Sequence, residues 1–207
     1  MKLHWAGYSV LLFIGSSVLG AGAPEIYTYW IEPCDRQESV CQPDDPQLAA
    51  WAMTAWQSAA HGALRLTEVK DRERARIRLY WATSEQGLYG EARPIVVDGK
   101  KGAEVFVRPA PLPTESDRLL RDAIVYLTCV HETGHALGLP HTAAFDDIMY
   151  SFQYGGDIPE YFARYRRKLH TRADIQKNSG LSEADRKTIA STIGNESSKQ
   201  QKGEPKN

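Results

Sequence analysis

Apolar side chains recur along this chain with two periods, one typical of strands and one typical of helices. In residues 75–81 they occupy every second position, with charged or polar residues between them, which predicts a strand with one buried face. Runs of β-branched and aromatic residues predict further strands at 26–31 and 64–69. A hairpin is predicted over 95–107, with a loop slightly longer than the Asp98-Gly99 pair. Helical patterns lie between and after these strands.

A first helix and a short last helix are predicted from their end signals. Asp45 has the position of an N-cap, with Pro46 at the first helical position, and Gly62 ends the periodic run. Near the C-terminus, Ser182 and Asp185 have the spacing of a capping box, and apolar residues recur one turn apart behind them. We therefore expect a helix from about 46 to 61 and a short one after 182.

A longer helix is predicted between these two. Thr114 or Ser116 can cap its N-terminus, and Gly138 ends it because glycine tolerates the left-handed turn that reverses a chain. Its broad face carries residues at helical spacing, namely Leu120, Ile124, Leu127, His131 and His135. This face carries both apolar residues and two histidines, so we expect it to contribute to the hydrophobic core and to a functional site.

Both ends of the chain are expected to lie outside the folded domain. Residues 1–21 have the layout of a secretory signal peptide, with Lys2, an apolar stretch at 8–19 and small residues at 20–23. The stretch is short for a bilayer span, so we expect cleavage, export and no stable membrane insertion, with an uncleaved anchor as the alternative. Residues 195–207 lack an apolar anchor and are predicted to be a disordered tail. One domain over 24–194 remains.

The composition is that of a globular protein and excludes several classes. Hydrophobic residues make up 42% of the chain, and 25 basic residues stand against 26 acidic ones. Without a basic excess, we expect no nucleic-acid partner, and we expect a monomer. Export favours a local disulfide between Cys34 and Cys41, with two free thiols as the alternative, and Cys129 is expected to be buried.

The strongest chemical signal is the segment 131–141, which reads HETGHALGLPH. His131 and His135 are four residues apart on a helix, so both rings leave one face and can bind one zinc ion. The break at Gly138 allows His141 to return as a third ligand, which leaves a fourth position for water, as in catalytic zinc sites. Glu132 is then placed to take a proton from that water and pass it to a leaving amine. The alternative is a zinc site without catalysis, which would not need Glu132.

This segment resembles the long zinc signature of the metzincin metallopeptidases, and Ile148-Met149-Tyr150 is similar to their Met-turn. Thr142 and the residues around the motif look most like the matrixin branch. The resemblance implies an α+β catalytic domain with a twisted, mixed five-stranded sheet, two long helices, a Met-turn and a short C-terminal helix. It also implies that Met149 forms a hydrophobic floor beneath the three histidines.

The same resemblance implies where substrate binds. Residues 88–93 look like an edge strand that pairs with an extended protein or peptide, and a pocket beside the zinc would take the residue that follows the scissile bond. The substrate-binding residues implied in this way are Tyr89, Gly90, Glu91 and Ala92 on the strand, with Val130, Tyr150, Phe152 and Tyr154 around the pocket.

Two departures from the matrixin pattern bear on metals and on the pocket. Residues 82–110 contain no histidine and a single aspartate, Asp98, so we expect one catalytic zinc and neither a structural zinc nor calcium. Ser151 stands where proline usually follows the Met-turn tyrosine, which changes the pocket wall. A basic and aromatic segment, 158–172, is either a solvated amphipathic helix or a contact surface for an acidic polymer.

Together these features predict a secreted zinc-dependent endopeptidase. Two alternatives remain at this stage: a zinc-bound, proteolytically silent peptide-binding module, and a zinc amidase acting on cell-wall peptides. The first would not require Glu132, and the second would not require an edge strand suited to extended peptides.

Overall fold

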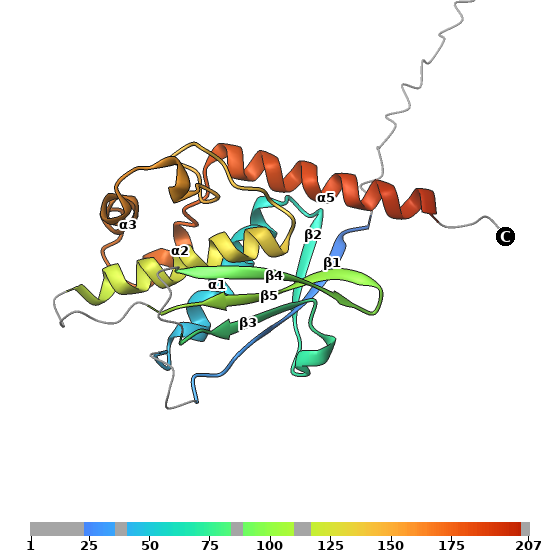
Figure 1. The fold of residues 1–207 in the computed structure, drawn as a ribbon, viewed down its shortest axis with the longest axis horizontal. Coiled ribbons are helices and arrows are strands. Elements are labelled where there is room, and N and C mark those ends of the chain that lie inside the picture. The colour runs from blue at the N-terminus through green and yellow to red at the C-terminus, as the bar shows by residue number, and fades with distance from the viewer. Residues whose placement is uncertain (1–22, 36–40, 84–88, 110–116, 204–207) are drawn as a thin grey trace, which may run out of the picture.

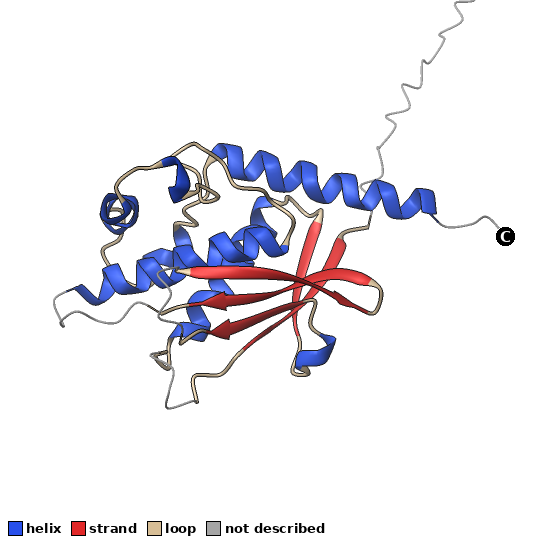
Figure 2. Cartoon of the chain, in the orientation of Figure 1, coloured by secondary structure: helices blue, strands red, loops and turns tan. Residues whose placement is uncertain are grey.

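The computed structural model describes residues 23–35, 41–83, 89–109 and 117–203, which form a mixed sheet packed against helices (Figures 1 and 2). The strands are β1 (Glu25–Ile31), β2 (Leu64–Glu68), β3 (Ile77–Trp81), β4 (Gly90–Val97) and β5 (Lys100–Val107). The α-helices are α1 (Asp45–Ala59), α2 (Arg118–Ala136), α3 (Ile158–Arg166), α4 (Asp174–Lys177) and α5 (Glu183–Gly203). Two short 3₁₀ helices are η1 (Arg72–Arg74) and η3 (Phe152–Tyr154). Among these helices, none is long and apolar enough to cross a membrane.

The five strands lie in the order β2-β1-β3-β5-β4, with β4 at one edge. All neighbours are parallel except β4 and β5, which form the predicted hairpin. Its loop is shorter than expected, because Val97 already pairs with Lys100 and only Asp98 and Gly99 make the turn. Both turn residues have positive φ, 49° and 72°, as a tight hairpin turn requires. The α+β fold with a mixed five-stranded sheet is therefore confirmed.

One face of the sheet builds the core. The alternating residues Ile77, Leu79 and Trp81 of β3 are buried, and α1 and α2 pack against each other and against this side of the sheet. The opposite face carries half-buried rings instead, with Tyr80 stacked on Phe106 at 5.3 Å between ring centres. The alternation of residues along the strand thus distinguishes the face of the sheet that the helices cover from the opposite, partly exposed face.

The N-caps of α1 and α2 differ from those expected. Asp44 is the N-cap of α1, and Asp45 is instead its first, fully buried residue, whose carboxylate is paired with Arg121 of α2. A buried carboxylate needs a partner, and Arg121 on the neighbouring helix supplies it. Asp117 caps α2 by accepting a hydrogen bond from the Leu120 N–H at 2.8 Å. Thr114 and Ser116 lie outside the described residues.

The C-terminal helix is longer than predicted. The capping box is present, with the Asp185 N–H donating to Ser182 Oγ at 3.0 Å and the Ser182 N–H donating to Asp185 Oδ2 at 2.8 Å. Helix α5 then continues to Gly203, into the stretch 195–207 for which the sequence predicts a disordered tail. Lysine and glutamine are good helix formers and extend a helix whose first turns are already packed. The predicted signal peptide, 1–21, lies outside the described residues.

Candidate zinc and peptidase site

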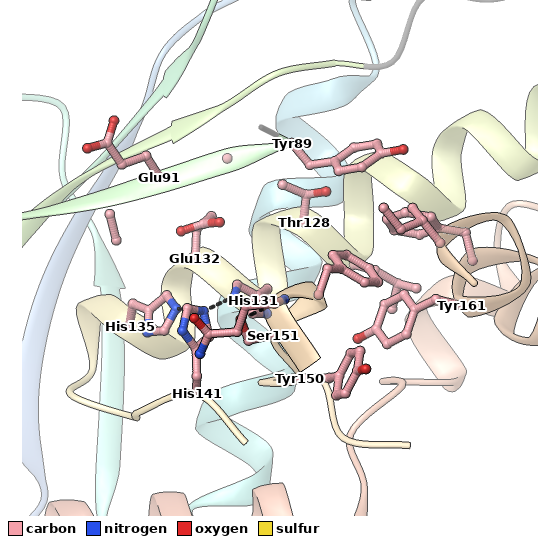
Figure 3. Close-up of a pocket in the computed structure, with 17 residues that line it drawn as sticks. Tyr89, Glu91, Thr128, His131, Glu132, His135, His141, Tyr150, Ser151 and Tyr161 are labelled. Carbon is pink, nitrogen blue, oxygen red and sulfur yellow. Dashed lines mark hydrogen bonds between the residues drawn. The ribbon is translucent and has the colours of Figure 1, made fainter. Parts of the chain in front are cut away.

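Three histidine rings converge at the C-terminal end of α2. His131 and His135 leave one face of the helix, and Gly138, with a φ of 90°, turns the chain so that His141 returns to them (Figure 3). His141 Nε2 lies 3.2 Å from His131 Nε2 and 3.0 Å from His135 Nε2. The i, i+4 spacing predicted this arrangement, and the turn at Gly138 completes it.

Backbone carbonyls orient two of these rings. His131 Nδ1 lies 2.6 Å from the Ile148 carbonyl oxygen, and His135 Nδ1 lies 2.9 Å from that of Leu139. A carbonyl oxygen only accepts, so each Nδ1 carries the proton and each Nε2 keeps a free lone pair. Burial lowers the pKa of His131 to about 4 and also lowers that of His135. Both rings are therefore neutral near pH 7, which is the form that binds metal.

This arrangement fits a zinc ion. Nitrogen ligands about 2.05 Å from a tetrahedral zinc lie about 3.3 Å apart, close to the separations seen here. The three histidines also form a group whose ligand atoms all lie within 4.8 Å of one another. With three nitrogen ligands a fourth position stays open, as in catalytic rather than structural sites.

Glu132 lies between the histidines and the edge strand. Its side chain is buried, with the residue 6% exposed, and it packs directly beneath Gly90 of β4 (Figure 3). A Cβ atom on Gly90 would lie 2.6 Å from Glu132 Cγ and 2.8 Å from Oε1. Burial, with a smaller contribution from the charge of Glu91, raises the pKa of Glu132 to about 8. A divalent cation at the histidines acts in the opposite direction, because positive charge favours the carboxylate.

The Met-turn supports the metal-binding helix from below. Met149 is buried, and its Sδ atom lies against Gly134, in the turn of α2 between His131 and His135. The turn is held by the Ile148 N–H, which donates to Asp185 Oδ2 at 2.8 Å, and by the Thr142 N–H, which donates to the Met149 carbonyl at 2.8 Å. Met149 thus has the place expected of a hydrophobic floor.

A cleft of about 710 Å³ opens beside the histidines. It is lined by β4, α2, η3 and α3, and six of the eight predicted substrate-binding residues line it: Tyr89, Gly90, Glu91, Ala92, Tyr150 and Phe152. The remaining apolar wall comprises Leu127, Ile158, Tyr161 and Phe162, and Thr128 also lines the cleft. The sequence placed Leu127 on the histidine face of the helix but did not assign any of these five residues to the pocket. Thr128 precedes His131 by three residues, so helical periodicity could have found it as well.

Two of the predicted pocket residues are misplaced. Val130 is fully buried on the other side of α2, where its carbonyl accepts a hydrogen bond from Trp56 Nε1 at 2.8 Å. It lies one position before His131, and neighbouring residues on a helix do not share a face. Tyr154 is 57% exposed and does not line the cleft, because η3 turns it toward solvent.

The basic segment is tied down by acidic partners. Arg164 pairs with Asp146, Arg166 with Asp117 and Arg167 with Glu160. Arg172 also donates to Asp122, at 3.1 Å. These pairs favour the amphipathic helix over a contact surface for an acidic polymer, since all four arginines already have acidic partners within the fold. Buried Tyr161, Phe162 and Tyr165 form the other face of α3.

The three cysteines occupy two environments. Cys34 and Cys41 are joined by a disulfide, with their Cα atoms 5.7 Å apart. Cys129 is free and fully buried in α2, and its burial raises the pKa of the thiol well above the usual range. It is therefore a core residue rather than a nucleophile.

Comparison with known proteins supports the same reading of the site. A family model described as matrixin matches residues 24–160, about two thirds of the chain. No curated protein matches the chain significantly. A similar solved structure is archaemetzincin (amzA) from Methanopyrus kandleri, at 14% identity and a TM-score of 0.44, with 86% of this chain and 99% of that chain covered. Since the family match includes the three histidines, Glu132 and Met149, the chain belongs to the matrixin family of metzincin zinc metallopeptidases.

Proposed function

We propose that the chain is a secreted zinc-dependent endopeptidase that hydrolyses peptide bonds in extended proteins or peptides. The observation that carries this proposal is the convergence of three Nε2 atoms beside the Glu132 carboxylate, directly under the edge strand. Metal ligands, a proton-transfer group and a peptide-binding strand thereby meet in one cleft.

Glu132 moves the proton in this reaction. Bound to the three histidines, zinc would acidify water and polarise the scissile carbonyl. The Glu132 carboxylate accepts a proton as the water oxygen forms a bond to the carbonyl carbon, and it then delivers that proton to the amine nitrogen as the C–N bond breaks. Its position under Gly90 keeps the carboxylate beside the bound peptide and away from bulk water.

The outer edge of β4 suits an extended peptide. The Arg108 N–H donates to the Tyr89 carbonyl at 2.9 Å, so odd-numbered residues of β4 bond to β5, while the backbone groups of Gly90 and Ala92 face outward. A peptide can add here as a further strand, held by main-chain hydrogen bonds. Pro94, the next outward position, has no N–H and ends the run of donors. The adjoining aromatic pocket fits a large apolar side chain after the scissile bond.

Export rests on the signal-peptide pattern of residues 1–21 and agrees with the Cys34–Cys41 disulfide, a bond typical of oxidising compartments. We propose that the mature protein is an extracytoplasmic monomer without a nucleic-acid partner. Of the two alternatives, a silent binding module gives no role to a buried Glu132, and a cell-wall amidase gives none to the aromatic pocket.

Cleavage of a denatured protein by the purified mature chain tests the proposal. We expect a chelator to abolish cleavage and added zinc to restore it. Glu132→Gln should keep zinc and lose about a hundredfold or more in kcat/KM, the scale of general acid–base catalysis. Glu160→Gln, which changes an exposed carboxylate on α3, is the matched control and should cleave normally. Undiminished cleavage by Glu132→Gln would overturn the mechanism.

A further inference from the structure

Different residues lie at the two ends of the cleft. Glu91 and His135 lie at one end, and Tyr89, the residue just before β4, lies at the other (Figure 3). The Tyr89 ring there contacts the ring of Phe162 from α3, with 5.1 Å between ring centres. Both residues line the cleft, so this aromatic pair bridges it from the β4 side to the α3 side. Phe162 lies beyond residue 160, where the match to the matrixin family ends.

The aromatic pair is close to the reacting bond. Glu132 packs beneath Gly90, so the bond under attack lies beside that residue. An extended chain advances about 3.3 Å per residue, and Tyr89 is one residue further along the strand. A peptide paired with β4 therefore has room for about one or two residues past the reacting bond before it reaches the two rings.

The Phe162 side of this pair is firmly backed. Phe162 is 4% exposed and contacts the Tyr161 ring at 5.3 Å, and Tyr161 in turn contacts Phe152 at 5.2 Å. The Tyr161 hydroxyl donates to the Asp147 carbonyl at 3.1 Å, which ties α3 to the Met-turn. A wall built of packed rings on an anchored helix yields less readily than a single exposed side chain.

We propose that Tyr89 and Phe162 limit the length of chain that can follow the scissile bond, so that the enzyme favours bonds close to the carboxyl end of its substrates. This inference rests on the proposed function and on the pocket taking the residue after the scissile bond. The pair acts sterically: two rings in van der Waals contact leave no room for a backbone to pass between them, so a longer chain has to bend out of the cleft and is cleaved more slowly. On the other side of the bond, the strand continues past Ala92, and no aromatic pair among the described residues bridges the cleft there.

Two series of synthetic peptides test the proposal. Both contain one cleavage sequence with a phenylalanine after the scissile bond; one is lengthened residue by residue on the carboxyl side and the other on the amino side. We expect kcat/KM to fall about tenfold once the carboxyl side exceeds about two residues, and no such fall on the amino side. Product masses identify the bond that is cut.

Tyr89→Ala and Phe162→Ala should each restore cleavage of the long carboxyl-side peptides. Tyr154→Ala is the control, because it makes the same change at an exposed ring outside the cleft. It should leave unchanged the fall in kcat/KM with carboxyl-side length. Should circular dichroism show that Phe162→Ala does not fold, Tyr89→Ala at the half-exposed strand end decides. Equal kcat/KM on long and short carboxyl-side peptides would overturn this inference but not the proposed function. So would a fall in kcat/KM with carboxyl-side length that persists in the folded variants. Failure to cut any peptide would overturn the proposed function, and the inference with it.

Discussion

Gly134 shows how much a single position decides in this site. It lies in α2 between two metal-binding histidines, with Met149 below it and the Trp56 ring beside it. A Cβ atom there would overlap Met149 Sδ and come within 3.0 Å of Trp56 Cζ2. Gly90 has a similar role above the helix, where the missing side chain makes room for Glu132. The two glycines let the floor and the edge strand approach the catalytic turn of α2 closely.

Gly134→Ala should therefore destabilise the protein, although alanine is the better helix former. We expect a net loss of about 1–3 kcal/mol from overpacking, measured as the free energy of unfolding in urea, together with weaker zinc binding. Gly194→Ala in α5 is the matched control, because a Cβ there meets nothing within 4 Å. It should stabilise by up to about 1 kcal/mol. A stabilising effect of Gly134→Ala would contradict the packing argument.

At the scale of elements, α1 and α2 are joined by a buried ion pair. Asp45 at the start of α1 is paired through both carboxylate oxygens with Arg121 of α2, and Asp45 Oδ2 also accepts the Gln42 N–H at 2.8 Å. Cys41 precedes Gln42, so the disulfide, α1 and α2 form one connected unit. The sequence signals located both helices, but they assigned Asp45 a capping role, because a local pattern does not reveal a partner 76 residues away.

Asp45→Asn should unfold more easily than the parent, since buried Arg121 loses its closest countercharge and keeps only the longer contact with Asp122, at 3.5 Å, among the ion pairs of the described residues. We expect a loss of about 3–5 kcal/mol in the free energy of unfolding. Replacing both partners, as in Asp45→Leu with Arg121→Met, should recover much of that loss. Breaking the exposed Arg167–Glu160 pair by Glu160→Gln should change stability little. Equal effects of the buried and exposed substitutions would refute this view of the pair.

Reduction of the Cys34–Cys41 disulfide should lower stability moderately. The bond closes a loop with a sequence separation of 7, and the entropy of closing so short a loop corresponds to about 2 kcal/mol. The paired variant Cys34→Ser with Cys41→Ser should unfold at a lower temperature than the parent and be insensitive to reductant. Free thiol titration of the native parent should detect neither Cys34 nor Cys41, and Cys129 only after unfolding.

For the whole molecule, the metal site connects parts of the chain that are distant in sequence. The histidines come from α2 and the turn after Gly138, the floor from Met149, and the Met-turn is held by Asp185 at the start of α5. A ligand that binds this assembled arrangement and not the unfolded chain stabilises the native state. Zinc is therefore expected to act on global stability as well as on activity.

Zinc at about a thousandfold excess over its Kd should raise the melting temperature by roughly 10 °C. Differential scanning calorimetry of chelator-treated and zinc-loaded protein measures this shift, and metal analysis should find one zinc per chain. Calcium at the same concentration should give no comparable shift, and neither should zinc added to His141→Ala. Two tightly bound zinc ions per chain would contradict the single-site prediction.

By itself, the sequence determined the local features: most of the strands, the helix that carries the histidines, the break at Gly138, and the identity of the three ligands and Glu132. These depend on periodicity and short spacing, which a few neighbouring residues encode. Only the tertiary structure decided which distant side chains meet: Asp45 with Arg121, Gly90 over Glu132, and Phe162 against Tyr89. The position of Tyr154 was decided in the same way, because the packing of η3 turns it toward solvent. Val130 is different: helical periodicity alone places it on another face from His131, because neighbouring residues on a helix do not share a face.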